Sequence, residues 1–197
     1  MTGNTTETAL LVIDMQKGYL NKDSIFFVDG APETVPACAE VIRFCRAREI
    51  PVFFITRCYA SDGSNVERSR LAAWERGGRP VSPGCAPELS IELPEAFGSD
   101  PRDHHIVKPR FSAFFATELD LLLRRLGVRE LILIGTTTPN CIRTTCYDAI
   151  ALDYDVTVIS DCTSSKTEEI QRANLYDMSG IGARILSSTE WMAERDR

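Results

Sequence analysis

Short runs of consecutive apolar residues recur along the chain and alternate with segments whose apolar residues have helical spacing. A continuous apolar run is typical of a strand buried on both faces, as in a parallel sheet covered by helices. The alternation therefore predicts a three-layer α/β/α fold with a six-stranded parallel sheet, Rossmann-like in its layering. We expect strands at 9–14, 51–56, 106–108, 130–134, 155–160 and 183–186, and helices at 33–48, 117–126, 140–152 and 166–179.

Residues 59–103 do not follow this alternation, because they are rich in Gly, Pro, Ser and charge. A connection of that length is uncommon in a compact domain and usually has a function. We expect it to hold a short helix near 66–76 and loops of an active site. It would then be a lid inserted into a single domain that spans residues 1–197.

Charge and composition limit the partners that we expect. The net charge is -6 and no basic run occurs, which argues against binding to nucleic acid. No apolar stretch approaches the roughly 20 residues of a membrane span, and the first residues do not resemble a signal peptide. We therefore expect a cytoplasmic protein. The seven cysteines lack C-x-x-C pairing and the two histidines are adjacent, so neither a disulfide framework nor a bound zinc ion is expected.

Three polar residues lie at or just past the ends of predicted strands. Asp14 follows the first apolar run, Lys108 ends the third, and Cys141 lies in a Thr- and Pro-rich turn after the run at 130–134. The carboxyl ends of parallel strands meet at one edge of the sheet, where ligands bind. An acid, an amine and a thiol there predict a nucleophilic site. The start of a helix at Cys141 would favour its thiolate.

Each of these residues also has a structural interpretation. Cysteine is often a small buried apolar residue. Asp14 and Lys108 could form an ion pair that only stabilises the fold. In the functional interpretation, Asp14 accepts the thiol proton and returns it to the leaving group, and Lys108 stabilises negative charge on the sulfur.

Three separated segments resemble motifs of the isochorismatase-like cysteine hydrolase superfamily and occur in the same order. They are residues 11–16 (Leu-Val-Ile-Asp-Met-Gln), 107–114 (Val-Lys-Pro-Arg-Phe-Ser-Ala-Phe) and 135–141 (Gly-Thr-Thr-Thr-Pro-Asn-Cys), the last followed by Thr144, Thr145, Asp148 and Ala149. The resemblance implies the fold of that family and a catalytic triad that cleaves amide or ureido C–N bonds through a thioester.

Residue by residue, the resemblance assigns Cys141 as nucleophile, Asp14 as general acid and base, and Lys108 as the charged helper. It also implies a cis peptide bond between Thr136 and Thr137. The oxyanion hole would then be formed by the backbone N–H groups of Thr137 and Cys141.

Two departures from the wider superfamily narrow the expected reaction. Nicotinamidases carry an Asp-x-His…His metal site after the second strand, whereas residues 56–63 contain no histidine here. Isochorismatases that cleave a vinyl ether often lack the cysteine that this chain has. The metal-free amidases remain, and the chain resembles N-carbamoylsarcosine amidase and ureidoacrylate amidohydrolase among them. An ether hydrolase and a non-catalytic, ligand-binding member are the alternatives. No Gly-x-Gly-x-x-Gly turn occurs, and no cofactor is expected.

Five residues are expected to contact the substrate, which would be a small amide or ureido compound. Arg57 would end the second strand on the functional edge and could grip a carboxylate through two hydrogen bonds, although pairing with Asp62 or Glu67 is an equal alternative. Gln16 could bind the carboxamide or orient Asp14. The remaining candidates are Phe111 and Phe114, which could also be core residues, and Thr136. The resemblance further implies a homo-oligomer, a dimer or tetramer, formed through residues 60–100 or the C-terminal helix.

Overall fold

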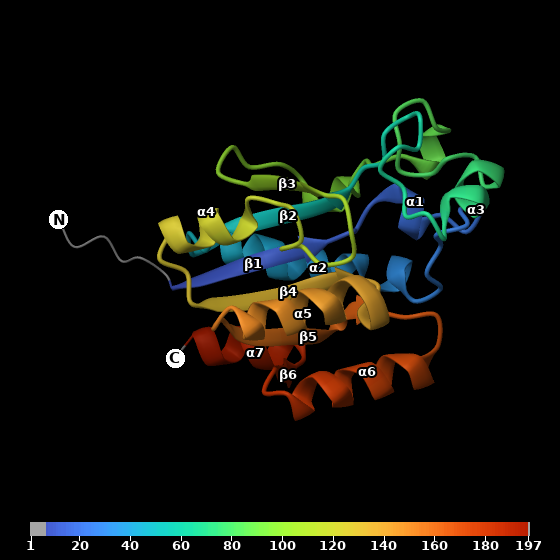
Figure 1. Ribbon diagram of the computed structural model, residues 1–197. Coiled ribbons are helices and arrows are strands. Elements are labelled where there is room, and N and C mark those ends of the chain that lie inside the picture. Colours follow the sequence, from blue (N-terminus) through green and yellow to red (C-terminus); the bar gives the residue numbers. More distant parts are fainter. Residues whose placement is uncertain (1–6, 197) are drawn as a thin grey trace.

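A six-stranded parallel sheet forms the middle layer of the protein (Figure 1). The computed structural model describes residues 7–196. Every pairing between neighbouring strands is parallel, which confirms the predicted α/β class and sheet. In order of pairing the strands are β3 (His104–Lys108), β2 (Val52–Arg57), β1 (Thr8–Ile13), β4 (Glu130–Thr136), β5 (Asp155–Ser164) and β6 (Arg184–Leu186).

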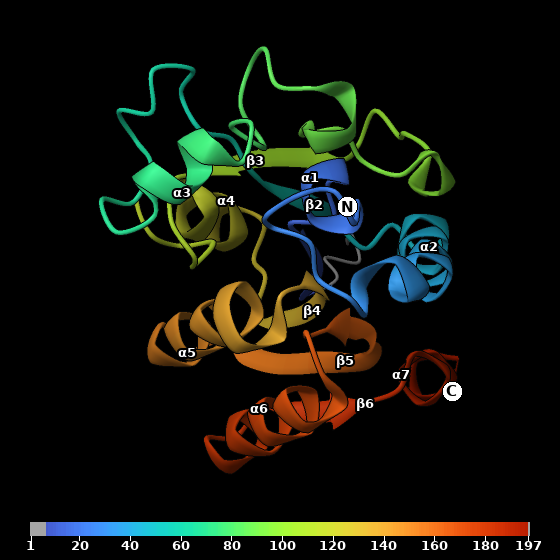
Figure 2. The same cartoon turned by 90° about the vertical axis from the view of Figure 1, so that its right-hand side faces the viewer.

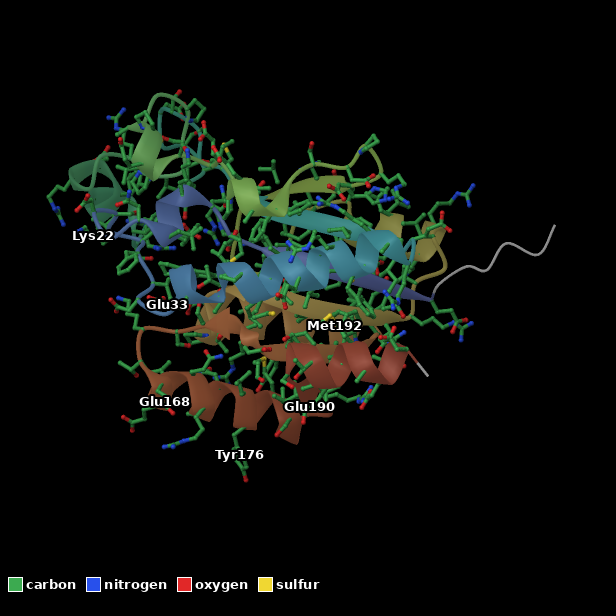
Figure 3. The ribbon with its side chains drawn as sticks, turned by 180° about the vertical axis from the view of Figure 1, so that it is seen from behind. Lys22, Glu33, Glu168, Tyr176, Glu190 and Met192 are labelled. Atoms are coloured by element: carbon green, nitrogen blue, oxygen red, sulfur yellow. The ribbon has the colours of Figure 1, made fainter. Side chains whose placement is uncertain are left out.

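Helices cover both faces of this sheet. One face carries α2 (Ala31–Ala47) and α7 (Ser188–Arg195), which lie in front of the sheet in Figure 3. The other face carries α4 (Leu119–Arg125), α5 (Arg143–Ala151) and α6 (Glu168–Gly180). In Figure 3 the side chain of Tyr176 points outward from α6, and 81% of this residue is exposed.

The two apolar cores explain why the strands read as continuous apolar runs. In β1, Leu11 and Ile13 pack with α4 and α5, whereas Leu10 and Val12 pack with α2 and α7. Both sets are buried, so β1 has no polar face. A strand enclosed in this way has its first access to a cavity at its carboxyl end.

The lid segment has a small apolar cluster of its own. It contains α3 (Leu71–Arg76) and two short 3-10 turns, Pro87–Leu89 and Glu95–Phe97. Trp74 of α3 is fully buried, and its indole N–H donates to the carbonyl of Pro80 at 2.9 Å. The cluster joins the lid to the segment around α1 (Lys17–Leu20) and consists of Tyr19, Phe26, Tyr59, Val66, Trp74 and Val81.

Several element boundaries differ from those expected. β5 runs on to Ser164, four residues past its predicted end, because Gly135 and Thr136 of β4 pair with Thr163 and Ser164 after a register shift. The helix predicted at 140–152 is a π-helical turn, Thr138–Ile142, followed by α5. No bounds were predicted for α1 or α7, because α1 has only four residues and α7 only eight, too few for a clear apolar period.

Candidate active site

The carboxyl edge of the sheet gathers the three residues expected to react. Figure 2 views the molecule from this side, with the lid segment and α1 around the edge. Asp14 directly follows β1, and its amide donates to the carbonyl of Ile55 in β2 at 2.8 Å. Lys108 ends β3, opposite Arg57 of β2, and Cys141 lies in the turn after β4. The predicted convergence of Asp14, Lys108 and Cys141 is therefore present in the structure.

Lys108 is the centre of this network. Its Nζ lies 2.7 Å from Asp14 Oδ2, 3.5 Å from Cys141 Sγ and 3.1 Å from the carbonyl oxygen of Arg110. Asp14 and Lys108 are completely buried and Cys141 is 3% exposed. The second carboxylate oxygen of Asp14, Oδ1, has no hydrogen-bond partner among the described residues. A buried acceptor without a partner is costly, and it is available for a proton.

The resting form of Cys141 differs from the expected thiolate. Burial raises the pKa of the Cys141 thiol to about 11, and the Asp14 carboxylate adds to this, while Lys108 and Arg57 oppose it. The thiol is therefore protonated at neutral pH. Cys141 lies within the π-helical turn that precedes α5, and the cost of burying its charge outweighs the effect expected from a helix start.

Close packing between β4 and β1 shapes the turn that holds Cys141. Gly135 has a φ of +115°, and a Cβ atom there would lie 2.1 Å from the carbonyl oxygen of Ile13. The peptide bond between Thr136 and Thr137 is cis, as the resemblance implies. The amide of Thr137 donates to no acceptor within residues 7–196, whereas its carbonyl accepts from Asn140 and Ile142. A free N–H beside Cys141 is what an oxyanion hole requires.

A cavity of about 200 Å³ lies against Cys141. Thr137 and Cys141 form part of its wall, and the aromatic side chains of Tyr19, Phe26 and Phe111 form another part. Its wall combines apolar and aromatic side chains with polar groups, among them Arg70, Asn140 and Lys166, so a small polar molecule can bind there.

Of the five side chains expected to contact substrate, only Phe111 lines this cavity. Gln16 is fully buried and pairs with the backbone of Arg57, donating to its carbonyl at 2.9 Å and accepting from its amide at 2.7 Å. Phe114 stacks on Tyr154 with ring centroids 5.9 Å apart. Thr136 is buried, and its hydroxyl accepts from Ser164 at 3.0 Å. These contacts hold the strands and helices together.

Arg57 also lies outside the cavity wall. It is fully buried, and its Nη1 pairs with Glu67 and with the hydroxyl of Tyr59, so the alternative pairing with Glu67 is the one present. Its Nε and Nη2 atoms lack partners among the described residues, and its guanidinium lies 5.0 Å from the ring of Phe111. Arg57 therefore lies near the ring of Phe111 but does not itself line the cavity.

Three residues of the cavity wall were missed as site residues. They are Tyr19, Arg70 and Lys166, none of which the sequence analysis assigned to the site. Burial and the charge of Asp14 raise the pKa of the Tyr19 hydroxyl, so it is present as a phenol. Lys166 closely follows β5 on the functional edge, and the correct end of that strand would have identified it.

Other parts of the described chain offer less for chemistry. A larger hollow, about 730 Å³, lies at the opposite, amino end of the strands, where Arg195 pairs with Glu130 and Thr8. It contains no cysteine or histidine. Within residues 7–196 no three His, Cys, Asp or Glu side chains gather as metal ligands would. No described helix has the length and apolar character needed to cross a bilayer.

Comparison with known proteins gives the family. Residues 8–190 match the isochorismatase domain. The chain is 40% identical to a probable inactive nicotinamidase of Arabidopsis thaliana, with 95% of each chain covered. It is 28% identical to the ureidoacrylate amidohydrolase RutB of Azorhizobium caulinodans, covering 87% of this chain and 83% of the relative. An isochorismatase family protein of Desulfovibrio vulgaris superimposes with a TM-score of 0.89 at 37% identity, over 97% of this chain and 99% of the other. The chain therefore belongs to the isochorismatase domain family of hydrolases.

Proposed function

We propose that this protein is a cysteine amidohydrolase that cleaves the C–N bond of a small carboxamide or ureido compound and releases ammonia. One observation carries the proposal. Lys108 Nζ lies 3.5 Å from Cys141 Sγ and 2.7 Å from Asp14 Oδ2. Cys141 lines a cavity, and so does Thr137, whose N–H has no acceptor within residues 7–196. Nucleophile, base and oxyanion donor are the parts that acyl transfer requires.

In the first half-reaction, Asp14 accepts the proton of the Cys141 thiol while Sγ attacks the carbonyl carbon of the substrate. The carbonyl oxygen becomes an oxyanion, which the N–H groups of Thr137 and Cys141 stabilise. Asp14 then donates its proton to the leaving nitrogen, the C–N bond breaks, and ammonia departs. The acyl group remains on Cys141 as a thioester.

In the second half-reaction, a water molecule gives a proton to Asp14 and attacks the thioester carbon. The same oxyanion forms and collapses, the C–S bond breaks, and Asp14 returns the proton to Cys141. Lys108 holds Asp14 through its ion pair and keeps a positive charge beside the sulfur whenever the sulfur carries negative charge.

The relatives support a C–N bond as the target, since the named activities among them include ureidoacrylate amidohydrolase. Nicotinamide is a poor candidate for the substrate. Residues 56–63 lack the histidines of the nicotinamidase metal site, and a relative at 40% identity bears the name of a probable inactive nicotinamidase.

Ammonia release tests the proposal directly. We would assay the wild type and Cys141→Ala on N-carbamoylsarcosine, ureidoacrylate, biuret, maleamate and nicotinamide. Cys85→Ala is the matched control, because Cys85 is a half-buried cysteine of the lid that does not line the cavity. We expect ammonia from at least one ureido or amide compound with wild type and Cys85→Ala, and none with Cys141→Ala.

Two outcomes would contradict the proposal. Turnover that survives in Cys141→Ala would exclude the thioester route and favour an ether-cleaving or water-activating hydrolase. Binding of a panel compound without turnover by the wild type would favour a non-catalytic member of the family.

A further inference from the structure

The charged side chains in the wall of the active-site cavity are all cationic. Arg70 and Lys166 line it, and none of the residues that line it is an aspartate or a glutamate. The other polar side chains of the wall are neutral at pH 7, among them Tyr19 and Asn140. The cavity beside Cys141 therefore has a positive potential and no carboxylate of its own to balance it.

Arg70 is held in place by aromatic rings and not by an acid. Its guanidinium carbon lies 4.5 Å from the ring centre of Phe26 and 5.6 Å from that of Phe111, and both rings also line the cavity. No ion pair or side-chain hydrogen bond of Arg70 occurs within residues 7–196. Rings beneath a guanidinium orient its plane and leave the N–H groups at its edge free to donate.

The acid nearest to Arg70 in the sequence, Glu67, pairs with other residues. Glu67 lies three residues earlier and gives its carboxylate to the buried Arg57 and to the hydroxyl of Tyr59, at 2.6 Å from the latter. Arg57 and Arg70 approach the same ring, Phe111, at 5.0 and 5.6 Å, but only Arg57 receives a carboxylate. Arg70 remains the arginine with access to a ligand.

Lys166 reaches the cavity from a different part of the fold. It follows β5 and precedes α6, whereas Arg70 belongs to the lid segment just before α3. Lys166 is exposed and forms no ion pair within the described chain. Two cations without an acidic partner in the described chain thus come from two separate segments to one cavity.

We propose that Arg70, assisted by Lys166, binds a carboxylate of the substrate while its amide or ureido carbonyl lies at Cys141. This proposal rests on the proposed function and names its substrate class: a short carboxylic acid that carries a ureido or carboxamide group. The cavity of about 200 Å³ has the volume of roughly seven water molecules, so the compound must be small. A guanidinium edge matches a carboxylate with two parallel hydrogen bonds.

The first experiment compares an acid with its neutral analogue. The probe pair is the N-carbamoyl amino acid that the wild type hydrolyses best and the methyl ester of the same compound. Arg70→Gln should lower kcat/KM for the acid by about 10- to 100-fold, mainly through KM, because a hydrogen bond to a charged group is lost. The ester should change by less than about threefold, and Arg70→Lys should recover part of the loss for the acid.

The matched control is Arg68→Gln, which removes the same charge from the same segment. Arg68 is exposed and does not line the cavity. This variant should hydrolyse both compounds as the wild type does. If Arg70→Gln lowers kcat/KM for acid and ester alike, Arg70 is a packing residue and the proposal is wrong.

A second experiment does not depend on amidase activity. Iodoacetate and iodoacetamide alkylate the same thiol and differ in charge, so the ratio of their rates at Cys141 reports the potential of the cavity. The rates are measured by mass spectrometry of the peptide that contains Cys141. We expect Arg70→Gln combined with Lys166→Gln to lower the iodoacetate-to-iodoacetamide ratio by at least about fivefold, and Arg68→Gln to leave it unchanged.

The two experiments separate the two proposals. A lowered ratio in an enzyme that releases no ammonia from any amide would refute the amidohydrolase function and support the anion site. An unchanged ratio in the double variant would refute the anion site, whatever the enzyme hydrolyses.

Discussion

Asp14→Asn should make Cys141 a more available nucleophile and at the same time abolish turnover. The carboxylate is one of the causes that raise the pKa of the thiol to about 11, and its removal leaves Lys108 at 3.5 Å from the sulfur. The thiolate then faces a cation without the competing anion. We therefore expect the pKa of Cys141 to fall, although the base that the reaction needs is gone.

The size of the expected fall in the pKa of Cys141 follows from the distance between its sulfur and the Asp14 carboxylate. Asp14 Oδ2 and Cys141 Sγ each contact Lys108 Nζ, so they can be no farther apart than the sum of those distances, about 6.2 Å. Two like charges at that separation repel by about 2.7 kcal/mol at an effective dielectric constant of about 20, which corresponds to about two pH units. A shorter separation gives more, so the pKa should fall to about 9 or below.

Alkylation by iodoacetamide from pH 7 to pH 11.5, followed on the peptide that contains Cys141, measures this pKa. At pH 8 the variant should react about tenfold faster than wild type, since the gain in thiolate outweighs the lower nucleophilicity of a less basic sulfur. Cys85, half-buried in the lid, serves as the internal reference. Lys108→Met should shift the midpoint the other way, because the cation that lowers the pKa is lost. An Asp14→Asn midpoint equal to or above that of wild type would refute the reasoning.

Two further predictions concern stability. Gly135→Ala should lower the free energy of unfolding in urea by about 2 to 6 kcal/mol, because a Cβ atom there would clash with the backbone of Ile13 and the residue has a positive φ. In the control Gly180→Ala the Cβ meets no atom, so the stability should be unchanged or higher. Equal losses in the two variants would contradict this prediction. Glu67→Gln should cost about 1 to 3 kcal/mol at pH 7 by leaving Arg57 buried without its anion. Burial raises the pKa of Glu67, but the Tyr59 hydrogen bond and Arg57 lower it more, so the pKa in the folded state lies below the unfolded value. The difference should therefore be complete above about pH 4.5, shrink below it, and vanish only below the lowered pKa of the folded state.

The sequence predicted the parts of the site that lie on strands. Asp14 follows β1, which is buried on both faces and therefore leaves a strong apolar pattern. Lys108 ends β3, an edge strand in which only Ile106 and Lys108 are buried, so its apolar run is short. Their carboxyl ends share an edge by the geometry of a parallel sheet, so the convergence with Cys141 followed without knowledge of any loop. The protonation of Cys141 did not follow, because the degree of burial outweighed the local helix start.

The parts of the site that lie on loops were predicted poorly. The extension of β5 to Ser164 depends on a register shift in β4, which no local pattern reveals, and Lys166 was missed with it. Arg57 and Arg70 have the same chemistry, and only the tertiary position of Glu67 decides which of them is free. Composition and spacing carry no information about such a choice between partners.

A thiol with a pKa of about 11 can still act as the nucleophile at neutral pH, because its proton does not have to leave the site. Before transfer, the buried network contains the Asp14 carboxylate and the Lys108 ammonium; after transfer, it contains the Cys141 thiolate and the same ammonium. The negative charge moves from one neighbour of Lys108 to the other, and the net charge in the desolvated space does not change. Desolvation raises the pKa of Cys141 for loss of its proton to solvent. For transfer of the proton to Asp14 this effect largely cancels, because the buried site has the same net charge before and after. Two costs remain. One is the difference between an ion pair at 2.7 Å and one at 3.5 Å, and the other is the intrinsic difference in acidity between a thiol and an aspartic acid, about 6 kcal/mol. The forming C–S bond must offset both, so proton transfer and attack on the carbonyl carbon are expected to occur together.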